Sequence, residues 1–305
     1  MQHKVNGIIV VDKPVNISSA RVVAILKRMF KARKVGHTGT LDPLATGLMI
    51  CCINDATRLA RFFLLGNKRY EAVLCLGVET DTQDSTGTVV AMCDEINISQ
   101  HKIQSVFKKF TGDIQQYPPI YSALKHEGVP LYKLARQGNP VQKPPRQVYI
   151  SHIDILEINL PEIRFSVSCS AGTYIRTLCY DIGKTLACGG YLKQLRRVES
   201  CGFTLKDAIT LKELEALSSS GRLSDKVIDM ADALRGMPEY TSDGFLAEKI
   251  RHGVKISKKD ILSYQANNTE GFVKIINANN ELIAVLSHQS TDKDFRYCCV
   301  FHTGD

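Results

Sequence analysis

The chain alternates between apolar runs with strand character and apolar positions at helical spacing. A short apolar run at 7–11 predicts a strand over 7–12, and a second run at 48–53 indicates a buried strand because no polar residue interrupts it. Apolar residues at helical spacing predict helices at 20–30 and 99–110. Strict alternation at 165–170 predicts a half-buried strand. Strands and helices are therefore interleaved along the chain.

Capping residues predict where several helices begin. Ser18 and Ser19 can cap the helix near residue 20, because their side-chain oxygens can accept hydrogen bonds from the first turn. Asp55 can do the same for a helix that runs to Leu65. A further helix is expected near 224–235.

The order of these elements favours an α+β fold with a mixed sheet. Helices separate many strands, but turns such as Ser85-Thr86-Gly87 join strands directly, which a regular doubly wound fold does not do. Beyond residue 236 the pattern changes to short strands with polar turns, for example at 272–276. We therefore expect two domains, at 1–236 and 237–305.

The composition is that of a globular chain. Of its 305 residues 44% are hydrophobic, and no apolar run approaches the roughly 18 residues of a membrane span. The apolar cluster at 7–11 is too short for a signal peptide, so a cytoplasmic location is expected. The ten cysteines include no Cys-x-x-Cys pair, so neither a zinc site nor a disulfide framework is expected.

The charge balance favours a polyanionic partner such as nucleic acid. The net charge is +8, from 39 basic and 31 acidic residues. Six of the basic residues lie on or directly after the helix at 20–30: Arg21, Lys27, Arg28, Lys31, Arg33 and Lys34. They suit phosphate contacts, although a solvated helix face explains them as well. No G-x-G-x-x-G follows a strand and no P-loop is present, so no nucleotide cofactor is expected.

One segment concentrates candidate chemistry: Gly36-His37-Thr38-Gly39-Thr40-Leu41-Asp42-Pro43-Leu44-Ala45-Thr46-Gly47. Its three glycines permit close backbone approach, and Pro43 disfavours the helical region for Asp42, which holds that carboxylate extended and displayed. Taken alone, the segment also fits an ordinary turn. The rest of the chain decides between these interpretations.

The segment at 36–47 resembles the signature of the TruB family of tRNA pseudouridine synthases. Further stretches match the family in the same order: Asp12-Lys13-Pro14, Ser18-Ser19, Lys68-Arg69-Tyr70, Tyr121-Ser122-Ala123-Leu124-Lys125, Gly172-Thr173-Tyr174-Ile175-Arg176-Thr177 and Leu195-Arg196-Arg197. The resemblance covers about residues 5–215. It implies the pseudouridine synthase catalytic fold, with a mixed, largely antiparallel central sheet flanked by helices. The tail from about 240 resembles, more weakly, a small β-rich PUA-like RNA-binding domain.

The resemblance implies a reaction in which an RNA uridine is detached at its glycosidic nitrogen, rotated and rejoined through carbon 5. In bacterial members the target is the T-loop uridine at tRNA position 55. The expected partner is therefore the T arm of tRNA at the elbow. No cofactor, metal, membrane or protein partner is implied, and a monomer is expected.

The resemblance also implies roles for individual residues. Asp42 matches the catalytic aspartate, which would act on the ribose anomeric carbon, on the uracil ring or by a glycal route; the sequence leaves the three open. Tyr70 matches a tyrosine that stacks on the uracil, and Arg176 an arginine that pairs with the catalytic carboxylate.

Four further residues carry weaker expectations. Tyr174 matches a second active-site tyrosine and Leu195 an apolar wall of the uracil pocket. His37 matches a histidine that contacts RNA where the target base has left its stack. Lys13 matches a lysine near the pocket, for which we expect structural support.

Three other functions are alternatives to pseudouridine synthesis. An RNA-binding or tRNA-folding protein with secondary catalysis is disfavoured by the intact set of Asp42, Tyr70 and Arg176. A nucleosidase needs a second carboxylate, and none is obvious in the sequence. Guide-dependent modification is disfavoured because the matching stretches resemble bacterial members.

Overall fold

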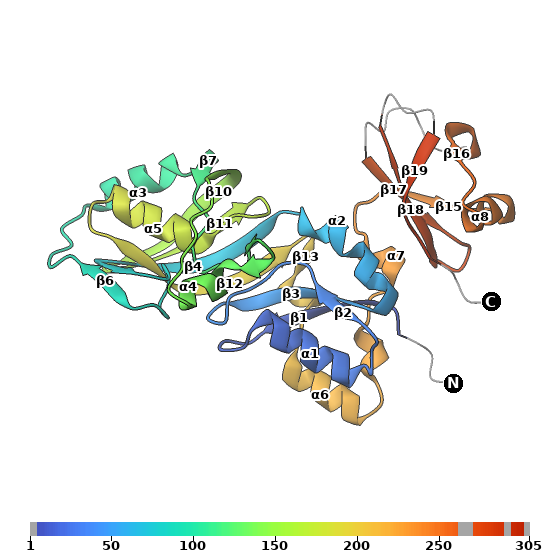
Figure 1. Ribbon diagram of the computed structural model, residues 1–305, viewed down its shortest axis with the longest axis horizontal. Coiled ribbons are helices and arrows are strands. Elements are labelled where there is room, and N and C mark those ends of the chain that lie inside the picture. The colour runs from blue at the N-terminus through green and yellow to red at the C-terminus, as the bar shows by residue number, and fades with distance from the viewer. Residues whose placement is uncertain (1–4, 262–270, 290–293, 302–305) are drawn as a thin grey trace.

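The computed structural model describes residues 5–261, 271–289 and 294–301. These residues form two principal sheets, a large one that makes up most of the molecule and a smaller one near the C-terminus (Figure 1). The large sheet consists of β1 (Gly7–Lys13), β2 (Val35–His37), β3 (Thr46–Ile53), β4 (Lys68–Leu76), β7 (Gly112–Gln116), β10 (Arg146–Asn159), β11 (Glu162–Cys169), β12 (Gly190–Ser200), β13 (Phe203–Thr204) and β14 (Ile209–Thr210).

The large sheet is mixed and mostly antiparallel. Its strand order is β14-β1-β3-β12-β4-β11-β10-β7, with β2 paired to β3 and β13 paired to β12. The pairs β1–β14 and β3–β12 are parallel, and the other pairings are antiparallel. The expected α+β class with a largely antiparallel central sheet is confirmed.

Helices cover the sheet differently in its two halves. In one half, α3 (Gln100–Lys109) and α5 (Ile175–Thr185) pack on β4, β10 and β11; in the other, α1 (Ser19–Met29) and α6 (Leu211–Ser219) pack on β1 and β3 (Figure 1). Alternate residues of β1 enter two different cores: Ile9 packs with α1, whereas Ile8 packs with α2 (Ala60–Leu64) on the opposite face. Burial on both faces explains why the apolar run at 7–11 is continuous.

Of the two expected helix caps, the one at Asp55 is wrong and the one at Ser18 is right. Asp55 does not cap a helix, because the N-cap residue of η1 (Asn54–Leu59) is Ile53. Asn54 takes a left-handed backbone with φ of 51°, so the chain enters the helix directly from β3 and Asp55 already lies in the first turn. The cap at Ser18 is confirmed, since its Oγ accepts from the backbone N–H of Arg21 at 3.2 Å.

The single helix expected at 224–235 is also wrong. The chain there forms η3 (Leu223–Lys226) and a short α7 (Met230–Ala233). Between them Ile228 is extended and pairs with Ile8, with N–O distances of 2.9 and 2.8 Å in the two directions. These backbone bonds continue the edge of β1 and outweigh the local helical preference.

The second sheet forms a β-rich domain at the C-terminal side. Its strands are β15 (Glu239–Thr241), β16 (Ile256–Ser257), β17 (Gly271–Ile276), β18 (Leu282–His288) and β19 (Asp294–Val300), in the order β15-β17-β18-β19-β16. The helix α8 (Gly244–Arg251) and η4 (Lys258–Asp260) complete it. The C-terminal β-rich domain is thus confirmed, while the division at 236–237 stays a prediction.

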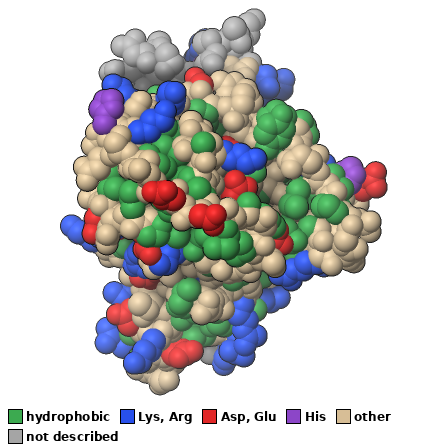
Figure 2. Space-filling view, turned by 90° about the vertical axis from the view of Figure 1, so that its left-hand side faces the viewer, with side chains coloured by type: hydrophobic (Ala, Val, Ile, Leu, Met, Phe, Trp, Pro, Cys, Tyr) green, Lys and Arg blue, Asp and Glu red, His purple; other side chains and the backbone are tan. Residues whose placement is uncertain are grey.

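The remaining elements lie around these two sheets. The hairpin of β5 (Val78–Thr80) and β6 (Val89–Met92) leaves Val89, Val90 and Met92 exposed, and apolar side chains reach the surface at that end of the molecule among charges of both signs (Figure 2). The others are β8 (Lys125–His126), β9 (Val129–Pro130), α4 (Leu131–Arg136) and η2 (Leu205–Asp207). Within the described ranges, no helix has the length and apolarity needed to cross a membrane.

Candidate active site

A cavity of about 370 Å³ opens where the segment 36–47 faces β4, β12 and the start of α5. Five of the predicted site residues line it: Asp42, Tyr70, Tyr174, Arg176 and Leu195. They come from the loop before β3, from β4, from the turn before α5, from α5 itself and from β12. The fold therefore brings together side chains that are up to 153 positions apart in the sequence.

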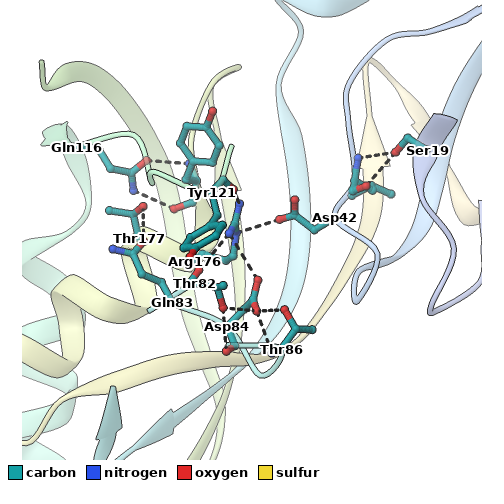
Figure 3. A network of polar contacts seen from close by, with 12 residues as sticks. Ser19, Asp42, Thr82, Gln83, Asp84, Thr86, Gln116, Tyr121, Arg176 and Thr177 are labelled. Carbon is teal, nitrogen blue, oxygen red and sulfur yellow. Dashed lines mark hydrogen bonds and ion pairs between the residues drawn. The ribbon is translucent and has the colours of Figure 1, made fainter. Parts of the chain in front are cut away.

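Backbone contacts on both sides of Asp42 hold its loop in place. The Oγ of Ser19, at the start of α1, accepts from the N–H of Leu41 and donates to the Leu41 carbonyl, both at 2.9 Å (Figure 3). On the other side, the Lys13 ammonium donates to the carbonyls of Ile17 at 2.7 Å and Pro43 at 3.3 Å. Lys13 is fully buried, and this burial lowers its pKa to about 8. It lies behind the loop rather than on the cavity wall.

The Asp42 carboxylate forms an ion pair with Arg176, with 2.9 Å between Oδ2 and Nε (Figure 3). Arg176 is itself fixed, because Nη2 donates to the Tyr121 carbonyl at 2.8 Å and Nη1 to the Thr82 carbonyl at 3.0 Å. The side chain of Arg176 is 4% exposed, whereas that of Asp42 is 34% exposed. A rigid cation thus aims a partly accessible carboxylate into the cavity.

The environment of Asp42 shifts its protonation in two directions. Burial raises the pKa of the carboxyl above its ordinary value, while the Arg176 guanidinium and the Lys13 ammonium oppose this shift. A second carboxylate, Asp84, raises the pKa further. Arg176 and Lys13 therefore favour the ionised form of a carboxylate that burial alone would tend to neutralise.

Asp84 is a site residue that the sequence interpretation missed. Its Oδ2 lies 3.5 Å from Nη1 of Arg176, and its Oδ1 accepts from Thr82 Oγ1 at 2.8 Å and from Thr86 Oγ1 at 2.6 Å (Figure 3). Asp84 is 3% exposed and is not among the described residues that line the cavity. The polar segment at 80–87 contains two carboxylates, Asp81 and Asp84, and its turn-rich sequence gives no local signal that separates Asp84 from an ordinary turn residue.

The two tyrosines approach the cavity from different elements. Tyr70 on β4 is 7% exposed, and burial raises the pKa of its hydroxyl while Arg197, its cross-strand partner on β12, opposes the shift. Tyr174 is held by Gln116, whose amide accepts from the Tyr174 N–H at 2.7 Å and donates to its carbonyl at 2.9 Å. The guanidinium of Arg146 lies over the Tyr174 ring, 4.7 Å from its centroid.

Leu195 and His37 differ in their relation to the cavity. Leu195 is 8% exposed and pairs with Ala72 across β12 and β4, so both face the side on which Tyr70 lies. His37 ends β2, and its Nδ1 accepts from the backbone N–H of Gly39 at 3.3 Å. Burial lowers the pKa of His37. Among the described residues, its neighbours Thr38 and Gly39 line the cavity but His37 does not.

The structure gives no described cluster suited to a metal ion. No group of three or more His, Cys, Asp or Glu side chains in the described ranges is arranged to hold one. All ten cysteines are free, and most are buried.

Solved structures with the same fold place the chain in a class. It superposes with a TM-score of 0.75 on the chain in the "Crystal Structure of a Cbf5-Nop10-Gar1 Complex", at 26% identity, covering 97% of this chain and 84% of that chain. A second match is the "Crystal structure of the archaeal box H/ACA sRNP Nop10-Cbf5 complex", with a TM-score of 0.73, 25% identity, and coverage of 98% and 86%. The chain therefore has the pseudouridine synthase fold, with a cavity centred on an aspartate.

Sequence relatives narrow the class to one family. The profile described as "TruB family pseudouridylate synthase (N terminal domain)" matches residues 27–175, and "tRNA pseudouridylate synthase B C-terminal domain" matches 176–235. A protein named tRNA pseudouridine synthase B from Syntrophotalea carbinolica is 47% identical over 233 residues, 76% of each chain. Its namesake from Geobacter sulfurreducens is 40% identical over 256 residues, 84% of each chain. The chain belongs to the TruB family of pseudouridylate synthases, which confirms the resemblance.

Proposed function

We propose that this chain is a tRNA pseudouridine synthase that isomerises the T-loop uridine at position 55 of tRNA. The observation that carries the proposal is Asp42, the one carboxylate among the described residues that line the cavity, held by the buried Arg176. The family and the relatives named tRNA pseudouridine synthase B support the same activity.

The target uridine reaches Asp42 only after leaving its stack. A base folded into the T loop is inaccessible, so it must be flipped out, which costs a few kcal/mol that stacking and phosphate contacts recover. The cavity of about 370 Å³ is of a suitable size for one pyrimidine nucleoside. In this proposal the ring of Tyr70 stacks on the uracil, Tyr174 faces it and Leu195 forms an apolar wall.

The ionised Asp42 performs the chemistry in each of the three routes. Attack on the ribose forms a C1′–O bond while the C1′–N1 bond breaks and its electron pair goes to the uracil. Attack on the ring forms an O–C6 bond while the C5=C6 electron pair moves toward the C4 carbonyl. In the glycal route Asp42 takes the C2′ proton, the C1′–N1 bond breaks with its electron pair going to the uracil, and a C1′=C2′ double bond forms. Arg176 keeps the carboxylate ionised and oriented in all three.

The other expected features belong to the same proposal. His37 enters the space left by the flipped base, and Lys13 supports the loop that carries Asp42. The catalytic domain spans 1–236 and the PUA-like RNA-binding domain 237–305, and together they bind the T arm at the elbow. The enzyme acts in the cytoplasm as a monomer, without a protein partner.

The test is to replace Asp42 by Asn and incubate each protein with an unmodified tRNA transcript. Because Asn keeps the shape of Asp but lacks the charge and the nucleophilic oxygen, pseudouridine formation at position 55 should be abolished, while tRNA binding should remain within about threefold of the wild type. Sequencing that maps pseudouridine at every uridine reads both the activity and its position. An Asp42→Asn enzyme that modifies at the normal rate would refute the proposal.

The same assay distinguishes a nucleosidase from a pseudouridine synthase. That chemistry needs a second carboxylate at the reacting atoms, and Asp84, the nearest one to Arg176, is buried behind the cavity wall. Free uracil in the reaction mixture would indicate a nucleosidase.

A further inference from the structure

The cavity holds more positive charge than its carboxylate balances. Its lining includes Lys68, Arg146, Arg176 and Arg197 against the single carboxylate of Asp42. Arg176 is already paired with Asp42 and Asp84, and Arg146 lies on the Tyr174 ring. Lys68 and Arg197 have no carboxylate within 4.0 Å in the described part of the chain. Buried cations without counter-ions are unfavourable unless another group compensates them.

Backbone carbonyls satisfy only some of the donors on these two cations. The Lys68 ammonium donates to the carbonyls of Leu64 at 3.3 Å and Gly66 at 2.6 Å, which leaves the third of its three N–H groups free. In Arg197, Nε donates to the Leu48 carbonyl at 2.6 Å and Nη2 to the Gly39 carbonyl at 3.1 Å, while no carbonyl contacts Nη1 among the described residues. Lys68 is 8% and Arg197 2% exposed, and burial lowers the pKa of Lys68.

The side chains of Lys68 and Arg197 converge on Gly39, Lys68 through its Cε methylene and Arg197 through Nη1. A Cβ placed on Gly39 would lie 3.3 Å from Nη1 of Arg197 and 3.7 Å from Cε of Lys68. Gly39 also has a φ of 146°, a conformation that residues with a side chain rarely adopt. A side chain at Gly39 would therefore crowd Arg197 and Lys68 where they line the cavity, and we call this group the Gly39 cradle (Gly39, Lys68 and Arg197).

We propose that the Gly39 cradle binds a backbone phosphate adjoining the flipped uridine. The proposal rests on the proposed function, because a flipped nucleotide remains attached through two phosphates and carries an anion to the edge of the cavity. A phosphodiester oxygen can accept both the free Lys68 N–H and Arg197 Nη1, and its charge compensates the two buried cations. The contact with Leu64 and Gly66 gives Lys68 a structural role as well, but it does not account for the convergence on Gly39.

The test combines neutral phosphate analogues with a charge-removing substitution. T-arm RNAs carry a single methylphosphonate on the 5′ or the 3′ side of the target uridine, and binding is measured in the Asp42→Asn background so that no turnover occurs. Lys68→Gln removes the charge while its amide can still donate to a carbonyl. Lys212→Gln is the matched control, because Lys212 is an exposed lysine on α6 that does not line the cavity.

One methylphosphonate should weaken binding about tenfold in the background protein and in Lys212→Gln, and by less than about twofold in Lys68→Gln. The slope of log K against log salt should fall by about one in Lys68→Gln. If Lys68→Gln does not fold, Arg197→Lys, which removes the planar fork, should reduce the same coupling. Equal losses in all proteins at both linkages would overturn the Gly39 cradle.

Failure of the cradle is distinguishable from failure of the proposed function. If the wild-type enzyme forms pseudouridine in tRNA but shows no coupling between Lys68 and either phosphate, only the proposed phosphate site is wrong. If the wild-type enzyme forms no pseudouridine, the proposed function itself is wrong.

Discussion

The Arg176 guanidinium forms ion pairs with two carboxylates, Asp42 and Asp84. Its Nε contacts Asp42 and its Nη1 contacts Asp84, while the remaining bonds go to the carbonyls of Thr82 and Tyr121. Only a planar fork of donors can serve all four partners, so lysine is not equivalent at this position. The electrostatic state of Asp42 therefore depends on a residue that does not line the cavity.

Replacing Asp84 by Asn should move the acid limb of the reaction to lower pH. The negative charge of Asp84 raises the pKa of Asp42, so its removal lowers that pKa. Because the reaction needs ionised Asp42, the rate falls only below this pKa, and the fall then begins at a lower pH. Single-turnover rates between pH 4 and pH 8 measure the direction of the shift.

Asp225→Asn provides the control for that experiment. Asp225 is an exposed carboxylate on η3 that pairs with Arg222 at 2.8 Å; it neither lines the cavity nor contributes to the pKa shift of Asp42. Its profile should match the wild type. An Asp84→Asn profile shifted to higher pH would contradict the electrostatic assignment. A lower rate at every pH is expected in addition, because Arg176 loses one of its partners.

At the residue scale, the sequence predicted those members of the site that a family motif carries. Asp42, Tyr70, Tyr174, Arg176 and Leu195 do line one cavity. Asp84, Lys68 and Arg197 were not predicted as site residues, because their importance lies in contacts with groups distant in the chain. A charged residue in a turn or strand has no local pattern that distinguishes such a contact from solvent exposure.

Two adjacent serines at the start of α1 do different work. Ser18 caps the helix through Arg21 N–H, whereas Ser19 is 2% exposed and binds both backbone groups of Leu41. Through Ser19, the first turn of α1 therefore fixes the position of the loop that carries Asp42.

The two serines are expected to separate stability from catalysis. Ser18→Ala should lower the free energy of unfolding by about 1 kcal/mol through loss of the cap, with kcat unchanged. Ser19→Ala should lower it by about 1–3 kcal/mol, because both backbone groups of Leu41 lose their hydrogen bond to the Ser19 hydroxyl, and should also lower kcat by tenfold or more as the Asp42 loop loosens. Urea unfolding and single-turnover rates on the same preparations measure both. Equal kcat values for the two variants would contradict the role assigned to Ser19.

At the element scale, periodicity predicted the long strands and helices well and the short ones poorly. The strands at 7–12 and 48–53 and the helix at 99–110 follow from core faces that the sequence displays directly. The broken helix at 224–235 depends on Ile228, whose extended backbone pairs with Ile8, some 220 positions away. Local propensity contains no information about such an edge contact.

At the scale of the whole molecule, the two domains are joined through a shared core. Phe301, 6% exposed, packs in the cluster that contains Ile8 and Leu59, and the Arg58 guanidinium lies 4.9 Å from its ring centroid. Phe62 and Phe272 make an edge contact at 5.1 Å between the same two parts. The end of the molecule in Figure 2 carries charges of both signs, so the net charge of +8 forms no continuous basic face there. In the proposed function the T arm contacts both domains, which requires their relative position to be fixed.

Phe301→Ala should therefore affect tRNA binding more than chemistry. Removing a buried ring costs about 3–5 kcal/mol and weakens the attachment of the C-terminal sheet to η1 and β1. Because no contact of Asp42 or Arg176 is altered, kcat should stay within about twofold. If both domains bind the T arm, as proposed, KM for tRNA should rise about tenfold because their relative position is no longer fixed. Phe245→Ala, which truncates a 68% exposed ring on α8, is the control and should leave both parameters unchanged. A fall in kcat without a rise in KM would mean that the C-terminal domain supports the active site rather than the binding of tRNA.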